Sequence, residues 1–245
     1  MILRYLPLLF SAPQAFVILI AAFGVSMLVG LIFHEYCHAV VADRLGDFTA
    51  RRMGRLTLNP RAHYDPVGTT MIFLAGFGWA KPVPVNPNNT ANPKRSLLLI
   101  ALAGPASNLV VAALAGLPIR LGLIPFWHPF VGSGTAARWA EVWTRTPADL
   151  IGLFLGTIVL LNVLLAVFNM LPIPPLDGSK VLMGLLPDNL ARQYQRLEPW
   201  GMGILMLIII APYLTDGAVS MLIVTGPAIE LLLRFFVGDN AAWFG

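Results

Sequence analysis

An uncharged apolar run from Phe16 to Phe33 leads directly into the pentad His34-Glu35-Tyr36-Cys37-His38. A run of this length predicts a helix that enters a bilayer, because about 20 apolar residues span the hydrocarbon layer. On such a helix, histidines four residues apart face the same side and can share one Zn²⁺, with Glu35 beside them as a base. A charged residue at the bilayer centre costs about 2.5 to 3.5 kcal/mol on insertion scales, so a glutamate here indicates a functional site.

The composition excludes a soluble globular protein. Hydrophobic residues make up 57% and charged residues 11% of the 245 residues, whereas soluble domains carry about 25% charged residues. The formal net charge of +4 comes from basic residues scattered through short loops, which is the pattern of topology signals and indicates no nucleic-acid partner. The single cysteine, Cys37, excludes an internal disulfide. We expect the first apolar run to be a retained membrane anchor, because no signal-peptide cleavage site follows it.

The hydropathy pattern predicts an all-α polytopic integral membrane protein with four to five transmembrane helices, at about 14–41, 97–117, 150–171, 201–214 and 218–237. A shorter apolar segment at about 66–80, broken by glycines, favours a re-entrant segment over a span. Short strands are predicted near the cytoplasmic face, at Arg52–Pro60 and around Val83 and Val85. We expect residues 1–245 to form a single membrane-embedded domain.

The distribution of basic residues predicts the orientation of these spans. With this helix order, the loops at 43–95 and 172–199 lie on one side of the membrane, and that side carries most of the lysines and arginines. The positive-inside rule makes this side cytoplasmic in a cell membrane. The pentad then lies toward the cytoplasmic end of the first span, and Asp177 lies just beyond the cytoplasmic end of the third.

Two histidines leave a zinc ion short of ligands, because hydrolytic sites typically use three protein ligands and an open fourth position. Asp177 is the best third candidate, since it follows the proline-rich turn Leu171-Pro172-Ile173-Pro174-Pro175-Leu176 and precedes Gly178, which permits a tight backbone. The alternative is that Asp177 only caps a helix. The pattern predicts one Zn²⁺ per chain, held by His34, His38 and Asp177.

Such a centre favours metal-assisted amide hydrolysis. Zinc would acidify its bound water and polarise the scissile carbonyl, while Glu35 takes the water's proton and delivers it to the leaving amine. A rival hypothesis is a non-proteolytic membrane transporter or sensor that binds zinc through the same histidines. Glu35 discriminates between the two hypotheses, because hydrolysis needs a general base beside the ligands and transport does not.

These motifs resemble the site-2 protease family of intramembrane zinc metalloproteases. Three further phrases resemble its compact bacterial and archaeal branch: Ala42-Asp43-Arg44-Leu45-Gly46-Asp47, Gly78-Trp79-Ala80-Lys81-Pro82-Val83-Pro84-Val85 and Ala103-Gly104-Pro105-Ala106-Ser107-Asn108. The resemblance implies an all-helical protease without a PDZ or CBS domain, because no loop or tail here has room for one. It also implies a substrate that is a transmembrane segment of a membrane-tethered protein, cut within or near the bilayer in regulated intramembrane proteolysis.

The resemblance also assigns roles to individual residues. It implies that Glu35 is the catalytic base and that zinc is bound by His34, His38 and Asp177. Asn169 matches an asparagine of the family and would donate to a developing oxyanion or support the ligand loop. Without further domains, substrate choice would rest on the membrane helices, the lipid bilayer, or an adaptor or regulatory protein.

Other polar residues have a structural and a functional interpretation. His63 would either reach the zinc or the substrate, or stay a solvated loop histidine, and the sequence favours the solvated one. Asn108 and Asn162 are expected to hydrogen-bond between helices, outside the site. The extended stretch at Val83 and Val85 would hold an unwound substrate by strand addition, as would a similar stretch at Leu56–Leu58.

Overall fold

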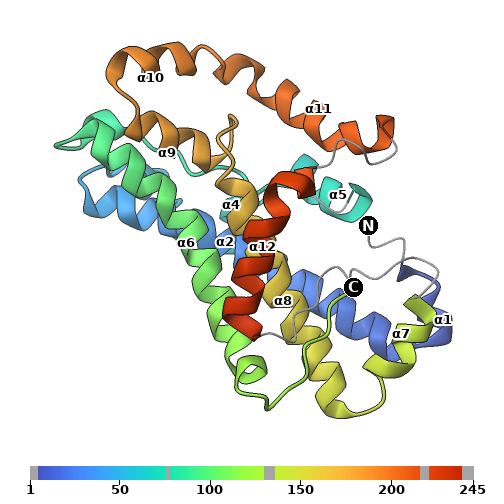
Figure 1. Ribbon diagram of the computed structural model, residues 1–245. Helices are drawn as coiled ribbons and strands as arrows, with labels where there is room; N and C mark the ends of the chain where they lie inside the picture. The colour runs from blue at the N-terminus through green and yellow to red at the C-terminus, as the bar shows by residue number, and fades with distance from the viewer. Residues whose placement is uncertain (1–4, 76–77, 130–135, 216–220, 239–245) are drawn as a thin grey trace.

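The structure, a computed structural model, describes residues 5–75, 78–129, 136–215 and 221–238. Within these ranges every regular element is a helix, and the helices differ greatly in length (Figure 1). The described part of the chain is therefore all-α, as the sequence predicts.

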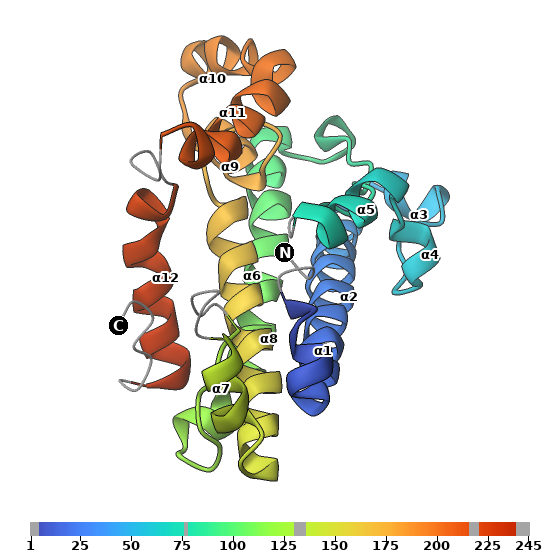
Figure 2. The ribbon, with the colours of Figure 1, turned by 90° about the vertical axis from the view of Figure 1, so that its right-hand side faces the viewer.

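Three helices are long and apolar enough to cross a membrane: α2 (Pro13–Arg44), α6 (Pro93–Arg120) and α8 (Pro147–Asn169). Each begins with a proline at its first position, where the fixed φ suits a helix and the missing N–H is not needed. The three helices overlap the first three predicted spans and pack side by side as the centre of a bundle (Figure 2). The chain is a membrane protein with these helices at its core.

A buried polar contact joins the three central helices. Asn108 of α6 donates from Nδ2 to the Gly30 carbonyl of α2 at 3.0 Å and to Asn162 Oδ1 of α8 at 3.1 Å. Gly30 allows this approach, because an added Cβ would lie 3.0 Å from Asn162 Oδ1. The prediction that both asparagines bond between helices is confirmed. In an apolar medium such bonds define which helix faces meet.

The helix α12 (Met221–Val237) packs along α6 and α8 on the side away from α2 (Figure 2). Val159 and Val163 of α8 are buried together with Ile229 and Leu233 of α12 in one apolar cluster. The last predicted span, 218–237, covers this helix, and its residues 218–220 lie outside the described residues.

The helix α11 (Gly201–Leu214) has the bounds predicted for a fourth span but does not run with the bundle. It lies across one end of it (Figure 2). Its 14 residues extend about 21 Å at about 1.5 Å per residue, less than the ~30 Å hydrocarbon layer. By length and composition three described helices qualify as spans, so the larger number of four to five stays a prediction.

The elements that surround the pentad gather at one end of the bundle. The helix α2 ends there before Gly46, whose φ is +106°, and α8 ends there because the prolines from Pro172 onward cannot continue a helix. Three short helices follow at the same end: α9 (Asp177–Leu185), α10 (Asp188–Gln195) and η3 (Glu198–Trp200) (Figure 2). The opposite end carries α1 (Leu8–Ser11) and α7 (Ala136–Trp143).

Small helices fill the connection from α2 to α6: α3 (Thr49–Arg52), α4 (Pro60–His63), α5 (Pro66–Ala75) and η2 (Pro87–Asn89). The Lys81 N–H donates to the His63 carbonyl at 2.9 Å, so the chain between these residues leaves and returns at one place. Such a return is what the predicted re-entrant segment at 66–80 requires. Residues 76–77 of that segment lie outside the described residues.

The two predicted strands are absent from the described residues. Arg52 ends α3, and Gly54 then turns the chain with a φ of +66°. Val83 and Val85 lie in an extended stretch, but no second stretch pairs with it within the described ranges. The prediction was wrong because it rested on side-chain alternation alone, whereas a strand also requires a hydrogen-bonded neighbour.

Candidate metal centre

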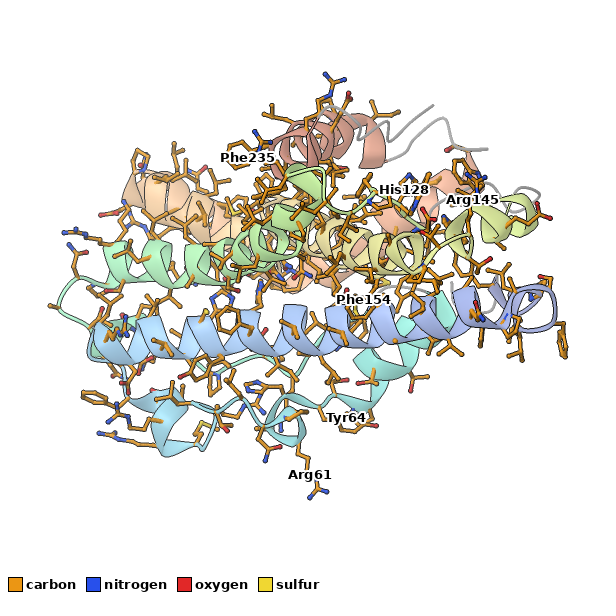
Figure 3. All side chains as sticks on the ribbon, turned by 90° about the horizontal axis from the view of Figure 1, so that it is seen from below. Arg61, Tyr64, His128, Arg145, Phe154 and Phe235 are labelled. Carbon is orange, nitrogen blue, oxygen red and sulfur yellow. The ribbon has the colours of Figure 1, made fainter. Side chains whose placement is uncertain are left out.

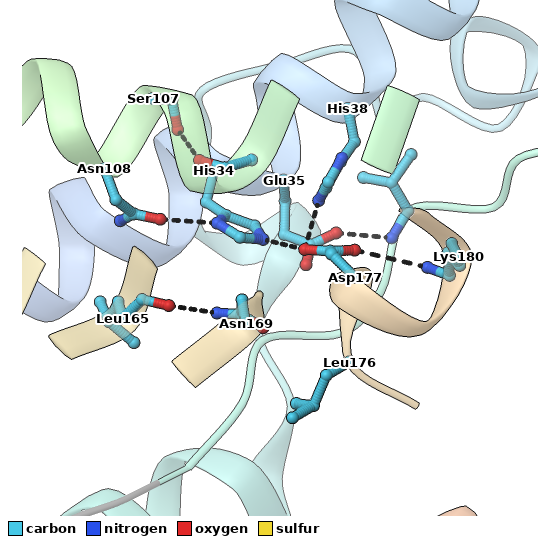
Figure 4. Close-up of polar contacts among 12 residues, drawn as sticks. His34, Glu35, His38, Ser107, Asn108, Leu165, Asn169, Leu176, Asp177 and Lys180 are labelled. Atoms are coloured by element: carbon cyan, nitrogen blue, oxygen red, sulfur yellow. Dashed lines mark hydrogen bonds and ion pairs between the residues drawn. The ribbon is translucent and has the colours of Figure 1, made fainter. Parts of the chain in front are cut away.

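Three side chains from two distant parts of the chain converge at the end of the bundle where the pentad lies (Figure 4). His34 and His38 lie one turn apart on α2, with ring centroids 4.6 Å apart and nearly perpendicular planes. Both Nε2 atoms face Asp177 Oδ2, at 3.0 Å from His34 and 3.2 Å from His38. All three residues are buried, and their candidate ligand atoms lie within 4.8 Å of one another. The structure thus brings together the three predicted zinc ligands.

The other nitrogen of each imidazole is fixed by α6. His38 Nδ1 lies 2.6 Å from the Ile100 carbonyl, which can only accept, so this nitrogen carries the proton. The expectation that Asn108 lies outside the site is wrong, because its Oδ1 lies 2.7 Å from His34 Nδ1. The Asn108 amide nitrogen is already used on Gly30 and Asn162. Both rings therefore present an unprotonated Nε2 toward Asp177 when they are neutral.

This arrangement fits one zinc ion. Two imidazole nitrogens and one carboxylate oxygen point at one buried place, where either a proton on the rings or a bound metal ion offsets the repulsion between their lone pairs. Two histidines and one carboxylate form the kind of three-ligand set that leaves a fourth position open for a catalytic water. The donor set and its supporting hydrogen bonds are those that hydrolytic zinc sites use.

The loop after α8 brings Asp177 to the histidines. Asp177 is the first residue of α9, and Leu176 occupies the N-cap position without a side-chain cap. The alternative that Asp177 only caps this helix is therefore wrong. Its Oδ1 lies 3.6 Å from Lys180 Nζ. Gly178 keeps the turn tight, because an added Cβ would overlap the Met170 and Leu171 carbonyl oxygens.

Gly104 is the point where α6 lies against the two imidazoles. An added Cβ there would lie 2.5 Å from His34 Nε2 and closer still to His38 Nε2. The absence of a side chain at Gly104 therefore lets α6 lie close to both rings. Sequence reasoning did not place Gly104 at the metal centre, because the periodicity of one helix does not show which partner it faces.

Glu35 lies beside the histidines but on a different side of α2. Its Oε2 accepts a hydrogen bond from the Val83 backbone N–H at 2.8 Å (Figure 4). The extended segment that carries Val83 is held in turn by Arg55, whose Nη2 donates to the Lys81 and Pro82 carbonyls at 2.7 and 2.9 Å. Sequence reasoning missed Arg55, which looked like one more basic loop residue but is 8% exposed.

A second anchor holds the far end of the same extended segment. Asp47, which is fully buried, accepts from the Asn86 N–H at 2.6 Å and from Asn89 Nδ2 at 2.8 Å. Hydrogen bonds from Thr49, Asn89 and Asn86 hold the pKa of Asp47 below its ordinary value, although burial acts in the opposite direction as the largest single cause. Asp47 ends one of the phrases that resemble the family, but its residue pattern alone does not distinguish it from a solvated aspartate.

Asn169 and His63, the two other candidate site residues, lie outside the group of proposed zinc ligands. Asn169 donates from Nδ2 to the Leu165 carbonyl of its own helix at 2.9 Å, and within the described residues it makes no hydrogen bond with the histidines or Asp177 (Figure 4). His63 is 3% exposed, so the expectation of a solvated loop histidine is wrong. Its Nε2 lies 2.8 Å from the Thr57 carbonyl.

The chain is similar to known proteins over most of its length. The family model for Peptidase family M50 matches residues 131–212, a stretch that includes Asp177. The Bacillus subtilis protein named "Putative zinc metalloprotease YwhC" is 36% identical over 188 residues, which cover 77% of this chain and 80% of that protein. No solved structure gives a significant match.

Two mycobacterial proteins, each named "Putative zinc metalloprotease Rip2", are also similar. The one from Mycolicibacterium smegmatis is 32% identical over 210 residues, covering 83% of this chain and 71% of that protein. The one from Mycobacterium tuberculosis is 32% identical over 193 residues, covering 76% and 66% respectively.

We predict that Gly104→Ala weakens zinc binding by about 10- to 100-fold, because the added methyl displaces both imidazoles from their supported positions. Gly116→Ala is the matched control, since its Cβ would press on the Phe236 carbonyl at 2.8 Å, far from the metal centre. Zinc affinity of each purified variant is measured by competition with a chelator. Wild-type affinity in a folded Gly104→Ala protein contradicts the geometry.

Proposed function

Because the chain belongs to peptidase family M50, the site-2 protease family of intramembrane zinc metalloproteases, we propose that His34, His38 and Asp177 hold its zinc ion and that Glu35 is its general base. The observation that carries this proposal is the convergence of both histidine Nε2 atoms on Asp177 Oδ2. The rival reading of a zinc transporter or sensor is not favoured, since the family and the relatives are metalloproteases by name.

The protein orients the side chains that would bind the zinc ion. Zinc, when bound, acts as a Lewis acid that lowers the pKa of a water to about 7 and polarises the scissile carbonyl. The Ile100 carbonyl and Asn108 Oδ1 hold the two imidazoles by their Nδ1 protons, so neither ring turns its Nε2 away. Burial excludes bulk water from the three ligand atoms.

Glu35 moves the proton. Its carboxylate accepts a proton from the attacking water and passes it to the leaving amine, so one side chain serves as base and then as acid. The Val83 N–H holds Oε2 at 2.8 Å and restricts the rotamers of the side chain. Arg55 supports this role from a distance by fixing the Lys81 and Pro82 carbonyls.

The family acts on membrane-embedded substrates, and the substrate of this chain belongs to that class. We further propose that it is a transmembrane segment of a membrane-tethered protein and that residues 1–245 form one catalytic domain. The shared packing of α2, α6, α8 and α9 supports a single domain. That Asn169 supports the loop carrying Asp177 stays a prediction. That an adaptor protein selects the substrates also stays a prediction.

We predict that Glu35→Gln keeps zinc and loses cleavage of a transmembrane substrate by about 10²- to 10⁴-fold, because an amide cannot take a proton but still accepts from Val83. Asp177→Asn lowers both zinc content and cleavage. Asp188→Asn is the control: its carboxylate lies on the surface, where it pairs with Lys94 at 2.8 Å, and the variant keeps both properties. Undiminished proteolysis by Glu35→Gln would sink the mechanism.

The orientation of the active site is a further part of the proposal. The end of the bundle that carries the metal centre also carries the described connecting residues at 45–75, 78–92 and 170–200, and with them most of the basic residues. By the positive-inside rule this end faces the cytoplasm of a cell whose plasma membrane holds the protein.

Thiol labelling of intact cells tests the orientation. In a Cys37→Ser background, we predict that a membrane-impermeant maleimide labels Leu123→Cys in intact cells but labels Arg52→Cys only after lysis. Both positions are exposed, and they lie at opposite ends of the bundle. The reverse pattern would place the metal centre on the outer side.

A further inference from the structure

A buried asparagine of α8, Asn162, is linked to the metal centre through one other side chain. Asn162 is fully buried and Asn108 of α6 is 1% exposed, and both lie where α2, α6 and α8 pack together. Figure 3 shows side chains filling the space between α2 and these neighbouring helices. Asn162 Oδ1 accepts from Asn108 Nδ2 at 3.1 Å, and Asn108 Oδ1 lies 2.7 Å from His34 Nδ1 (Figure 4). One side chain therefore separates Asn162 from a proposed zinc ligand.

These hydrogen bonds have a fixed direction, because two backbone carbonyls anchor them. A carbonyl oxygen only accepts, so the Ile158 carbonyl, 2.9 Å from Asn162 Nδ2, sets which end of the Asn162 amide donates to it. Asn162 Oδ1 then faces Asn108. The Gly30 carbonyl, 3.0 Å from Asn108 Nδ2, sets the Asn108 amide in the same way. Turning either amide over would bring two acceptors together, which leaves one favourable orientation for both amides.

This orientation determines how His34 is held. Asn108 Nδ2 carries two protons, and Gly30 and Asn162 accept both. Asn108 Oδ1 remains for His34 Nδ1, which therefore donates, and His34 Nε2 keeps its lone pair toward Asp177 Oδ2 at 3.0 Å. The neutral ring is then in the form that binds a metal ion.

The two histidines are oriented by different kinds of group. His38 Nδ1 lies 2.6 Å from the Ile100 carbonyl, a backbone group whose direction is set by its own helix. His34 depends instead on a side-chain amide, whose donor and acceptor ends have nearly the same shape. Further contacts are needed to fix which end faces the ring, and Gly30 and Asn162 supply them. The support from Asn162 therefore acts on His34 and not on His38.

We propose that Asn162 is a positioning residue for the metal centre, which keeps the Asn108 oxygen toward His34 and so keeps the His34 ring ready for zinc. The inference rests on the zinc site proposed above. A fully paired network in an apolar interior holds one arrangement, whereas a partly paired one lets the Asn108 amide turn its nitrogen toward the ring. The bland alternative is that Asn162 only ties α8 to α6 and has no effect on zinc.

Asn162→Leu tests the network without touching a zinc ligand. Leucine is close to asparagine in size but makes neither hydrogen bond, so Asn108 Nδ2 keeps only Gly30 as an acceptor. We expect zinc affinity, measured by competition with a chelator, to fall about tenfold. Thr157→Val is the matched control and keeps wild-type affinity, because Thr157 is also fully buried on α8 but donates to the Leu153 carbonyl of its own helix at 2.6 Å. Asn162→Ser, which is smaller, repeats the test if the leucine variant does not fold.

A double-mutant cycle and proton NMR distinguish positioning from packing. Asn108→Ala removes the partner of His34 and by itself weakens zinc binding about 10- to 100-fold. If Asn162 acts through Asn108, adding Asn162→Leu to Asn108→Ala weakens zinc binding no further, whereas independent packing effects would add. In the zinc-loaded protein we expect Asn162→Leu to move the Nδ1 proton signal of His34. The Nδ1 proton signal of His38 keeps its wild-type position, because the Ile100 carbonyl still holds that ring.

The outcomes separate this inference from the proposed zinc site. If His34→Ala binds zinc as tightly as the wild type, the zinc site is wrong and the inference falls with it. If His34→Ala loses zinc but Asn162→Leu keeps wild-type affinity, the zinc site stands and the inference is overturned. Additive losses in the double variant, or equal movement of both histidine signals, would also overturn it, because they would show a general effect on packing.

Discussion

The two hydrogen bonds from the histidine Nδ1 atoms to α6 are the interaction on which the site depends. His34 bonds to Asn108 and His38 bonds to Ile100, and Gly104 lies between these partners on the same side of α6. Positions 100, 104 and 108 are each four apart, so one stripe of α6 meets the two imidazoles along α2. These bonds fix the tautomers, the ring orientations and the helix contact together.

The helix α2 separates two chemical tasks on two of its sides. The side toward α6 carries the histidines, buried among helices that exclude water. The other side carries Glu35, whose carboxylate accepts a hydrogen bond from the Val83 N–H. A substrate entering along this second side would reach the base without disturbing the packed ligands. The division follows from the helical period, which places neighbours in the pentad about 100° apart.

Much of the site follows from local sequence signals, and the rest depends on contacts between distant segments. The pentad, the long spans and the proline turn before Asp177 are local patterns, so the sequence alone predicts them. The roles of Gly104 and Arg55 depend on which element lies opposite, and a single sequence carries no such signal. His63 was expected in solvent because it lies in a polar loop, yet tertiary packing buries it. The strands failed for the same reason, since alternation does not supply a pairing partner.

The central claim is that one zinc ion is bound by two imidazoles and one carboxylate, and X-ray absorption at the zinc edge of the purified wild type tests it most directly. The account predicts nitrogen and oxygen neighbours at about 2.0 to 2.2 Å, with the outer-shell scattering of two imidazole rings. The oxygen shell should change in Asp177→Ala, and one imidazole should disappear in His38→Ala. A sulfur neighbour at about 2.3 Å would contradict the account, and Cys37, the single cysteine of the chain, would be its source.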